Sequence, residues 1–408
     1  MGYVGLPLAV ESGKHYPTKG YDISATRITE LSKFQDRTKE VSSDEIRSSH
    51  QLLFSSQFQD LLDCNFYIVT VPTPIDDSKR PDLFFLTQAC KSLSEILKEN
   101  DIVVFESTVY PGCTQEVCVP ILAESGLTYN QDFFCGYSPE RINPGDKTKR
   151  LKDIVKVTSG SSEMAAKRVN EYYDTITEGK TFVASSIEVA EAAKVIENAQ
   201  RDINIAFVNE LAMIFERMGL DTLEVLEAAG TKWNFLPFKP GLVGGHCIGV
   251  EPYYLTFQAE KHGFNPNVIL AGRRTNDHMG VYIAGRIVKT LLANDIDIVG
   301  AKALVMGVTF KENCPDVRNS KVVDIVRELE EFNLDVDVSD PEADAEEVKN
   351  LYQITIKTDP DFEKYKLLIL AVGHDGFSEL DWENIASKIP FIFDVKGFLP
   401  KELVNSRL

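Results

Sequence analysis

Short apolar runs that end in loops recur near both ends of the chain. In the amino-terminal part these runs cover residues 65–71, 101–105 and 133–137. In the carboxyl-terminal part they cover residues 301–307, 334–338, 366–372 and 390–394. Runs of this kind are typical of parallel strands that are buried on both faces of a sheet. The pattern predicts an α/β fold with two doubly wound parallel sheets.

A long helical pattern covers residues 186–218, between the two series of runs. It is longer than an ordinary globular helix, and such helices usually connect domains or pack against a second copy of the chain. We therefore expect a homodimer formed through this helix. The expected domains are an amino-terminal one at residues 1–185, a central helical one at 186–294 and a carboxyl-terminal one at 295–408.

Composition and charge exclude several classes of protein. With 43% hydrophobic and 26% charged residues over 408 positions, the chain is neither disordered nor rich enough in apolar residues for a membrane protein. The net charge of −19 argues against nonspecific binding to nucleic acid or anionic membranes. Any phosphate ligand must therefore be held by local groups.

The seven cysteines are scattered and form no Cys-x-x-Cys pair. This spacing indicates neither a disulfide framework nor a metal site. The amino terminus also lacks the basic segment and cleavage site of a signal peptide. We expect a cytoplasmic protein with free thiols and no metal.

A glycine loop at the start of the chain runs into an apolar helix. Gly2 and Gly5, with Tyr3 and Val4 between them, match the second and third glycines of a dinucleotide-binding βαβ unit, and Asp22 lies where such units bind the ribose. A capped surface helix is the alternative for half a motif. The first strand and first glycine of the unit are missing, so we expect unpaired edges on two neighbouring strands and weak binding of NAD.

Polar residues follow the apolar runs of the amino-terminal part. Pro72 and Thr73 come after the first run, Thr108 after the second, and Glu140 and Arg141 after the third. Ligands of open α/β sheets bind at the carboxyl ends of strands, so we expect these residues near a ligand. Taken as an isolated pair, Glu140 and Arg141 more often form a surface salt bridge.

A second glycine-rich stretch, at residues 239–254, carries Cys247 directly after Gly244, Gly245 and a histidine. Such a loop lets the backbone approach a ligand closely and can present a nucleophile. A turn with an incidental buried thiol is the alternative. Lys194 and Asn198 are four residues apart, so they share one face of the long helix, where a solvated stripe is the alternative interpretation.

Taken together, these features resemble the nucleotide-sugar 6-dehydrogenases, the UDP-glucose/GDP-mannose dehydrogenase family. The motifs are Gly-Tyr-Val-Gly-Leu-Pro-Leu-Ala at 2–9, Glu-Ser-Thr-Val at 106–109, Ser-Pro-Glu-Arg-Ile-Asn-Pro-Gly at 138–145 and Gly-Leu-Val-Gly-Gly-His-Cys-Ile-Gly-Val at 241–250. The resemblance covers essentially the whole chain and implies two Rossmann-like sheets joined by a long central helix. The last motif looks most like that of members acting on UDP-N-acetylglucosamine or UDP-N-acetylgalactosamine.

The resemblance implies a chemistry for these residues. The family oxidises a primary alcohol to a carboxylate in two hydride transfers to NAD, through a thiohemiacetal and a thioester on a cysteine, here Cys247. By the same resemblance, Lys194 and Asn198 stabilise charge on the reacting oxygen. Glu140 is expected to act as the base of thioester hydrolysis, and Thr108 to position water near the nicotinamide.

Further residues are expected to bind the two ligands. The cofactor would contact the loop at residues 2–5, Asp22, Arg27, Pro72, Thr73, Thr108 and Arg318; the sugar nucleotide would contact Glu140, Arg141, Lys194, Asn198, Gly244 and Lys311. One departure concerns Glu251, because the family usually has an aspartate four residues after the cysteine. An extra methylene could misplace a carboxylate that we expect to order Lys194 and water.

Two alternatives remain open from the residues and the resemblance. The first is a dehydrogenase acting on UDP-glucose. The second is a truncated, noncatalytic protein that retains sugar-nucleotide binding through the carboxyl-terminal sheet. The expectation favoured here is an NAD-dependent dehydrogenase of a UDP-N-acetylhexosamine, used in the synthesis of surface polysaccharide, with neither nucleic acid nor membrane as a partner.

Overall fold

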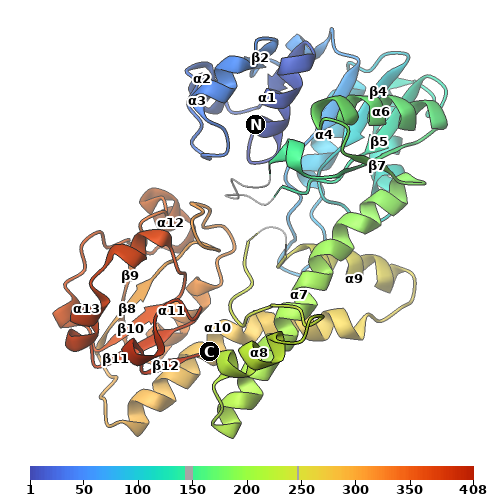
Figure 1. Cartoon of the computed structure of the whole chain (residues 1–408). Coiled ribbons are helices and arrows are strands. Elements are labelled where there is room, and N and C mark those ends of the chain that lie inside the picture. Colours follow the sequence, from blue (N-terminus) through green and yellow to red (C-terminus); the bar gives the residue numbers. More distant parts are fainter. Residues whose placement is uncertain (143–149, 246–247) are drawn as a thin grey trace. The chain divides into compact units, whose positions relative to one another are not determined.

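The long helix predicted at residues 186–218 is present as α7 (Ile187–Met218). The computed structural model describes residues 1–142, 150–245 and 248–408 of the chain. Two structural units share the chain: the first comprises residues 1–197 and 253–264, the second residues 198–252 and 265–408. Helix α7, green in Figure 1, begins in the first unit and ends in the second. The predicted three domains divide the chain differently and stay a prediction.

The first unit contains a five-stranded sheet with the order β3-β4-β5-β6-β7. Its strands are β3 (Phe66–Val69), β4 (Asp101–Phe105), β5 (Phe133–Tyr137), β6 (Lys156–Gly160) and β7 (Thr181–Val183). The three predicted runs are thus confirmed as strands, and β3, β4 and β5 are parallel. Strand β6 runs antiparallel to β5, and neither β6 nor β7 was predicted from the sequence.

A second, two-stranded sheet of the first unit pairs β1 (Thr18–Tyr21) with β2 (Leu52–Ser55) in parallel. Within the described residues, β1 pairs with β2 alone and β3 with β4 alone, so each has one unpaired edge, as expected. Helix α1 (Gly5–His15) contributes to two hydrophobic cores. Leu8 belongs to the core that includes residues of β4 and β5, and Leu6 and Val10 pack with residues of the α2 and α3 region.

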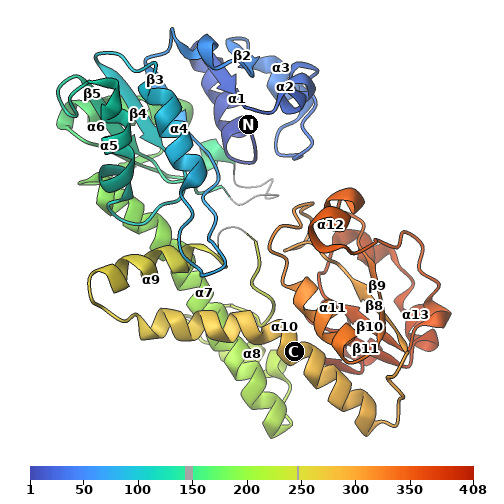
Figure 2. The same cartoon turned by 180° about the vertical axis from the view of Figure 1, so that it is seen from behind.

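The second unit contains a fully parallel sheet with the order β12-β11-β10-β8-β9. Its strands are β8 (Lys302–Met306), β9 (Asp335–Ser339), β10 (Leu367–Leu370), β11 (Phe391–Asp394) and β12 (Ser406–Arg407). Successive side chains of a strand point to opposite faces. Ala303 and Val305 accordingly join a core with α10 (Asn267–Ala293) and α11 (Val322–Glu331), whereas Leu304 and Met306 pack with α13 (Trp382–Lys388). Figures 1 and 2 show α11 and α13 on opposite sides of this sheet.

The described residues form further α-helices. They are α2 (Ala25–Ser32), α3 (Ser43–Ser48), α4 (Phe84–Ser94), α5 (Val119–Leu122), α6 (Glu163–Ile176), α8 (Thr222–Gly230), α9 (Glu251–Lys261) and α12 (Ala345–Tyr352). The architecture confirms the predicted α/β class, with one five-stranded sheet in each unit and a long central helix. Over the described ranges, none of the helices combines the length and apolar composition that crossing a membrane requires.

Candidate active site

The glycine loop at residues 2–5 fits the phosphate group of a dinucleotide. A Cβ on Gly5 would lie only 2.7 Å from Oγ1 of Thr70, so the close packing of α1 on the end of β3 requires glycine there. A Cβ on Gly2 would meet no described atom within 4 Å, which leaves room beside the loop. Tyr3 lies in the turn, and the N-cap Val4 offers no side-chain bond to the amides of α1. The amide of Leu6 donates to the carbonyl oxygen of Gly2 at 3.1 Å, so it is the dipole of α1 that would favour an anion at this end of the helix.

Asp22 directly follows β1, at the position predicted for the ribose carboxylate. Its carboxylate accepts a hydrogen bond of 2.8 Å from the N–H of Ser24 and forms an ion pair with the α-amino group of Met1. Burial favours the neutral acid, but these contacts outweigh it and hold the pKa of Asp22 below its usual value. The ionised carboxylate can accept hydrogen bonds from ribose hydroxyls.

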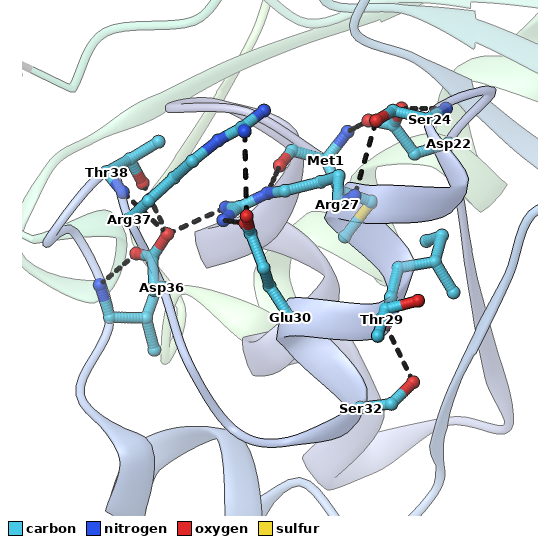
Figure 3. Close-up of polar contacts among 12 residues, drawn as sticks. Met1, Asp22, Ser24, Arg27, Thr29, Glu30, Ser32, Asp36, Arg37 and Thr38 are labelled. Atoms are coloured by element: carbon cyan, nitrogen blue, oxygen red, sulfur yellow. Dashed lines mark hydrogen bonds and ion pairs between the residues drawn. The ribbon is translucent and has the colours of Figure 1, made fainter.

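Arg27, predicted to contact the cofactor, is almost completely buried on α2 (Figure 3). Its Nη2 donates to Oδ1 of Asp36 at 2.7 Å, Nη1 lies 3.5 Å from Glu30, and Nε donates to the carbonyl oxygen of Met1 at 2.8 Å. Asp36 in turn accepts the N–H of Thr38. The guanidinium therefore ties the glycine loop to the loop after α2, and direct contact with the cofactor stays a prediction.

Thr73 and Thr108, from the carboxyl ends of adjacent strands, contact each other. Oγ1 of Thr73 donates to the carbonyl oxygen of Thr108 at 2.7 Å. The hydroxyl of Tyr254, on α9, donates to the carbonyl oxygens of Thr73 and Pro74 at 2.7 and 3.0 Å, next to Pro72. Tyr254 was not predicted as a site residue, although it closes the glycine-rich stretch at residues 239–254. Helix α9 thus fixes the loop after β3.

Glu140 and Arg141 follow β5 but do not pair with each other in the described contacts. Glu140 accepts a hydrogen bond from the N–H of Ile142. Arg141 lies 2.8 Å from the carboxylate of Glu197 on α7, and its Nη1 donates to the carbonyl oxygen of Val155 at 2.6 Å. Arg141 thus anchors this loop to α7 within the first unit, and its predicted contact with the substrate stays a prediction.

Lys194 and Asn198 both lie on α7 and are both buried, at 5% and 7% exposure. Nδ2 of Asn198 donates to Oε2 of Glu251 at 2.5 Å, and Glu251 is only 2% exposed at the start of α9. The longer side chain of Glu251 therefore reaches Asn198 directly. A fixed amide and a buried ammonium on one helix can stabilise negative charge on a bound oxygen.

Truncation of Glu251 should measurably destabilise the fold. Glu251→Ala removes the acceptor of a buried amide, and we expect the free energy of unfolding to fall by about 1–3 kcal/mol. In a double-mutant cycle with Asn198→Ala, urea unfolding should show a coupling of about 0.5–3 kcal/mol. The exposed Glu260 of the same helix is the control, and Glu260→Ala should change stability by less than about 0.5 kcal/mol. Equal effects of the two truncations would contradict the assigned contact.

The predicted nucleophile Cys247 and its neighbour His246 lie outside the described residues. The chain that leads to them is closely packed in the second unit. A Cβ on Gly244 would lie 2.6 Å from the carbonyl oxygen of Asn319, and one on Gly245 would lie 2.7 Å from the ring of Phe310. Gly245 also has a φ of 79°, a conformation that favours glycine. These glycines bring the loop against the loop that follows β8.

Asn209 of α7 holds the start of the same loop, a role that the sequence did not reveal. Its side-chain amide exchanges two hydrogen bonds with Gly241: Nδ2 donates to the carbonyl oxygen at 3.0 Å, and Oδ1 accepts the N–H at 2.8 Å. Nδ2 also donates to Oδ1 of Asn276 on α10 at 2.8 Å. All these groups are buried, so the loop has a fixed starting point.

The loop after β8 carries Lys311 and Arg318. Lys311 lies with its ammonium 5.5 Å from the ring centre of Phe310, and Arg318 makes a two-point contact with Asp316, at 2.9 and 2.7 Å. A pocket at the carboxyl end of this sheet is lined by Leu242, Thr309, Phe310, Lys311, Glu312, Ser320, Lys321, Val322, Ala371, Val372 and Lys396. Of its three lysines, Lys396 forms an ion pair with Glu312 at 2.9 Å, Lys321 forms one with Asp324 at 3.1 Å, and Lys311 is the third. Within the described ranges, no His, Cys, Asp and Glu side chains cluster as a metal site would require.

Glu191, one turn before Lys194 on α7, is another residue that the sequence did not reveal. Its carboxylate accepts the N–H of Gly112 at 2.6 Å and both the N–H and the hydroxyl of Thr114 at 2.9 and 2.6 Å. Burial raises the pKa of Glu191 to about 7, although these three hydrogen bonds act in the opposite direction. Glu191 therefore fixes the loop after β4, which contains Thr108.

Glu191 should make stability depend on pH. Its pKa in the folded state is about 7 and its ordinary value is 4.5, so between these values the folded protein holds a proton that the unfolded chain releases. The contribution of Glu191 is therefore present below pH 4.5 and is lost as the pH rises to about 7. Urea unfolding across this window should show a steeper decline for the wild type than for Glu191→Gln. The exposed Glu210 on the same helix is the control, and a Glu210→Gln profile that deviates equally from wild type would contradict the assignment.

Comparison with known proteins matches the whole architecture to one family. Three domain models of the UDP-glucose/GDP-mannose dehydrogenase family match the chain: the NAD binding domain at residues 1–177, the central domain at 188–278 and the UDP binding domain at 304–401. The first contains the glycine loop and Asp22, and the last contains the pocket after β8. The predicted cofactor, NAD, and a nucleotide-sugar substrate are therefore confirmed.

Individual relatives cover nearly the full chain. UDP-N-acetyl-D-glucosamine 6-dehydrogenase of Pseudomonas aeruginosa is 55% identical over 100% of this chain and 98% of that protein, and Protein CapL of Staphylococcus aureus is 48% identical over 99% and 96%. The structure of UDP-D-ManNAc dehydrogenase from Pyrococcus horikoshii matches with a TM-score of 0.89 at 27% identity, over 100% of this chain and 96% of that one. The chain therefore belongs to the UDP-glucose/GDP-mannose dehydrogenase family and is an NAD-dependent nucleotide-sugar dehydrogenase.

Proposed function

We propose that the protein oxidises the C6 alcohol of UDP-N-acetylglucosamine to the carboxylate. The observation that carries this proposal is the identity of 55% and 51% over the whole chain to two UDP-N-acetyl-D-glucosamine 6-dehydrogenases, against 30% to a UDP-N-acetyl-D-mannosamine dehydrogenase. The similarity favours an N-acetylated sugar over glucose. A role in supplying surface polysaccharide precursors and a cytoplasmic location stay predictions.

The buried polar groups of α7 support this chemistry. NAD, when bound, supplies the acceptor for the hydride that is removed in each oxidation. Lys194 and Asn198 would stabilise the oxygen on C6 as it becomes negatively charged. The thiolate of Cys247 would then add to the carbonyl carbon of the aldehyde to form a thiohemiacetal, and the second oxidation would convert this adduct to a thioester.

Hydrolysis of the thioester would release the product. Glu140 would accept a proton from water as the water oxygen bonds to the acyl carbon. The carbon–sulfur bond then breaks, the thiol of Cys247 is restored, and the sugar leaves as the carboxylate.

A panel of UDP-sugars tests the proposed substrate. The protein would be incubated with NAD and UDP-N-acetylglucosamine, UDP-N-acetylgalactosamine, UDP-N-acetylmannosamine or UDP-glucose, and kcat/KM and products would be measured. We expect the highest kcat/KM for UDP-N-acetylglucosamine, with two molecules of NADH formed for each uronate. A higher kcat/KM for UDP-glucose, or one NADH for each product molecule, would contradict the proposal.

The predicted homodimer also belongs to this proposal. In the part of α7 that lies in the second unit, Phe207, Ile214 and Met218 are exposed by 56%, 41% and 61% and lie seven and four residues apart, on one side of the helix. An apolar stripe of this kind suits a second copy of the chain. For the wild type, light scattering after size-exclusion chromatography should give twice the chain mass of 45.6 kDa. The double variant Phe207→Glu/Ile214→Glu should give the mass of one chain. A monomeric wild type would contradict the dimer.

A further inference from the structure

A fully buried ion pair of the first unit contacts the segment that precedes Glu140. Lys156, the first residue of β6, and Glu106, directly after β4, are 0% and 1% exposed, and their charged groups are 2.7 Å apart. The hydroxyl of Tyr173 on α6 donates to the second carboxylate oxygen of Glu106. The ring of Tyr173 also lies 5.2 Å from the ammonium of Lys156. Both charges are thus enclosed by protein groups.

The ammonium of Lys156 has two further acceptors, and both belong to the segment that leads into Glu140. Nζ donates to the carbonyl oxygen of Pro139 at 2.9 Å and lies 3.5 Å from that of Ser138. An ammonium has three protons to donate, and here Glu106, Pro139 and Ser138 accept them. The side chain of Lys156 therefore holds the two peptide groups that immediately precede the proposed base.

We propose that Lys156 is a positioning residue for thioester hydrolysis: it fixes the backbone before Glu140 and so aims the carboxylate of Glu140 at the attacking water. Glu106 compensates the charge of Lys156, and Tyr173 orients Glu106. The inference rests on the proposed function, in which Glu140 is the base. It concerns a step after both oxidations, so it predicts a defect in product release from the enzyme and not in binding.

Energetic considerations favour a positional role over simple packing. Burying two charges costs so much desolvation that apolar residues of similar volume usually stabilise a protein as well or better. An apolar side chain at position 156 would pack against Tyr173 but could not bond the carbonyls of Ser138 and Pro139. Burial raises the pKa of Glu106, the positive charge of Lys156 opposes this shift, and the negative charge of Glu140 adds to it.

Two variants separate the charge of Lys156 from its hydrogen bonds to the backbone. Lys156→Met leaves the carboxylate of Glu106 buried without its cation, so a large fall in Tm is expected. Lys156→Met combined with Glu106→Gln removes both charges and should restore most of the Tm. The double variant still lacks the bonds to Ser138 and Pro139. We expect its kcat to be lower by about 10–10²-fold, because small misplacement of a catalytic group has effects of this order.

The accumulating species identifies the affected step. In the double variant, NADH should form in a rapid burst of about two per active site, followed by slow turnover, and mass spectrometry of the quenched protein should detect the acyl group. kcat/KM for NAD and for the UDP-sugar should stay within about twofold of wild type, and KM should fall together with kcat, because the slowed hydrolysis follows binding and both oxidations. Lys302→Met with Asp335→Asn is the matched control: it removes an exposed lysine–aspartate pair in the second unit, 2.7 Å apart, and should leave kcat unchanged.

The outcomes distinguish this inference from the proposed function. A double variant with restored Tm and wild-type kcat would overturn the positioning role, since neutral burial alone would then suffice. Glu140→Gln tests the base separately: it should show the same burst and the same acyl-enzyme. If Glu140→Gln hydrolyses the thioester at the wild-type rate, the assignment of the base fails. A double variant with slow turnover and no burst would place its defect before the thioester and would also overturn the inference.

Discussion

The Cys247→Ser variant should bind NAD and the sugar nucleotide but form almost no uronate. A serine hydroxyl is a much poorer nucleophile than a partly ionised thiol, so the covalent adduct that permits the second oxidation cannot form at a useful rate. Loss of a covalent nucleophile lowers turnover by on the order of 10³-fold or more. Product analysis by mass spectrometry, with UDP-N-acetylglucosamine and excess NAD, measures the effect, and NAD titration measures binding.

Cys64 provides the control for this experiment. Its side chain is half-buried in the first unit, and burial raises the pKa of its thiol, so it is a poor nucleophile. Cys64→Ser should retain wild-type turnover. Undiminished uronate formation by Cys247→Ser would exclude Cys247 as the covalent residue, and loss of activity in both variants would show that serine substitution harms the fold rather than the chemistry.

Lys194→Ala should lower kcat far more than it raises KM. Lys194 is only 5% exposed on α7, one turn from Asn198, and the charge of its ammonium has most effect when the substrate oxygen becomes anionic. Removal of a preorganised donor of this type costs about 10²–10³-fold in turnover. Steady-state kinetics with varied UDP-sugar and saturating NAD separate the two parameters.

An exposed lysine gives the comparison for Lys194. Lys167 on α6 has a side-chain exposure of 76% and forms a surface ion pair with Glu171. Lys167→Ala should leave both kinetic parameters within about twofold of wild type, because surface pairs contribute little. A rise in KM with unchanged kcat in Lys194→Ala would make Lys194 a binding residue for the ground state and would contradict its role at the reacting oxygen.

The sequence predicted the strands that consist mainly of apolar residues, but it did not predict strands that contain buried polar residues. Residues 101–105 and 133–137 were predicted with the bounds that β4 and β5 have, because short, nearly continuous apolar runs are typical of strands buried on both faces of a sheet. Strand β6 starts with Lys156, and its sequence Lys-Val-Thr-Ser-Gly has no apolar run. Lys156 can be buried because Glu106, 50 positions earlier in the chain, accepts its charge.

The contacts that the predicted site residues make were only partly predictable. Lys194 and Asn198 share a helix face because of their spacing, and Thr73 and Thr108 meet because adjacent parallel strands end at the same edge. By contrast, the partner of Arg141 is Glu197 on another element, not its neighbour Glu140. Such long-range pairs depend on how the elements pack, which no local pattern encodes.

What the sequence determined by itself is therefore a set of elements: the apolar strands of the two five-stranded sheets, a long helix and glycine loops, all of which follow from local periodicity and backbone freedom. Only the tertiary structure decided which polar groups could be buried. Glu191, Asn209 and Lys156 are ordinary polar residues in the sequence, and each is buried because distant backbone or carboxylate groups satisfy it. An unsatisfied buried polar group costs too much free energy, so its partners exist only where the fold brings distant segments together.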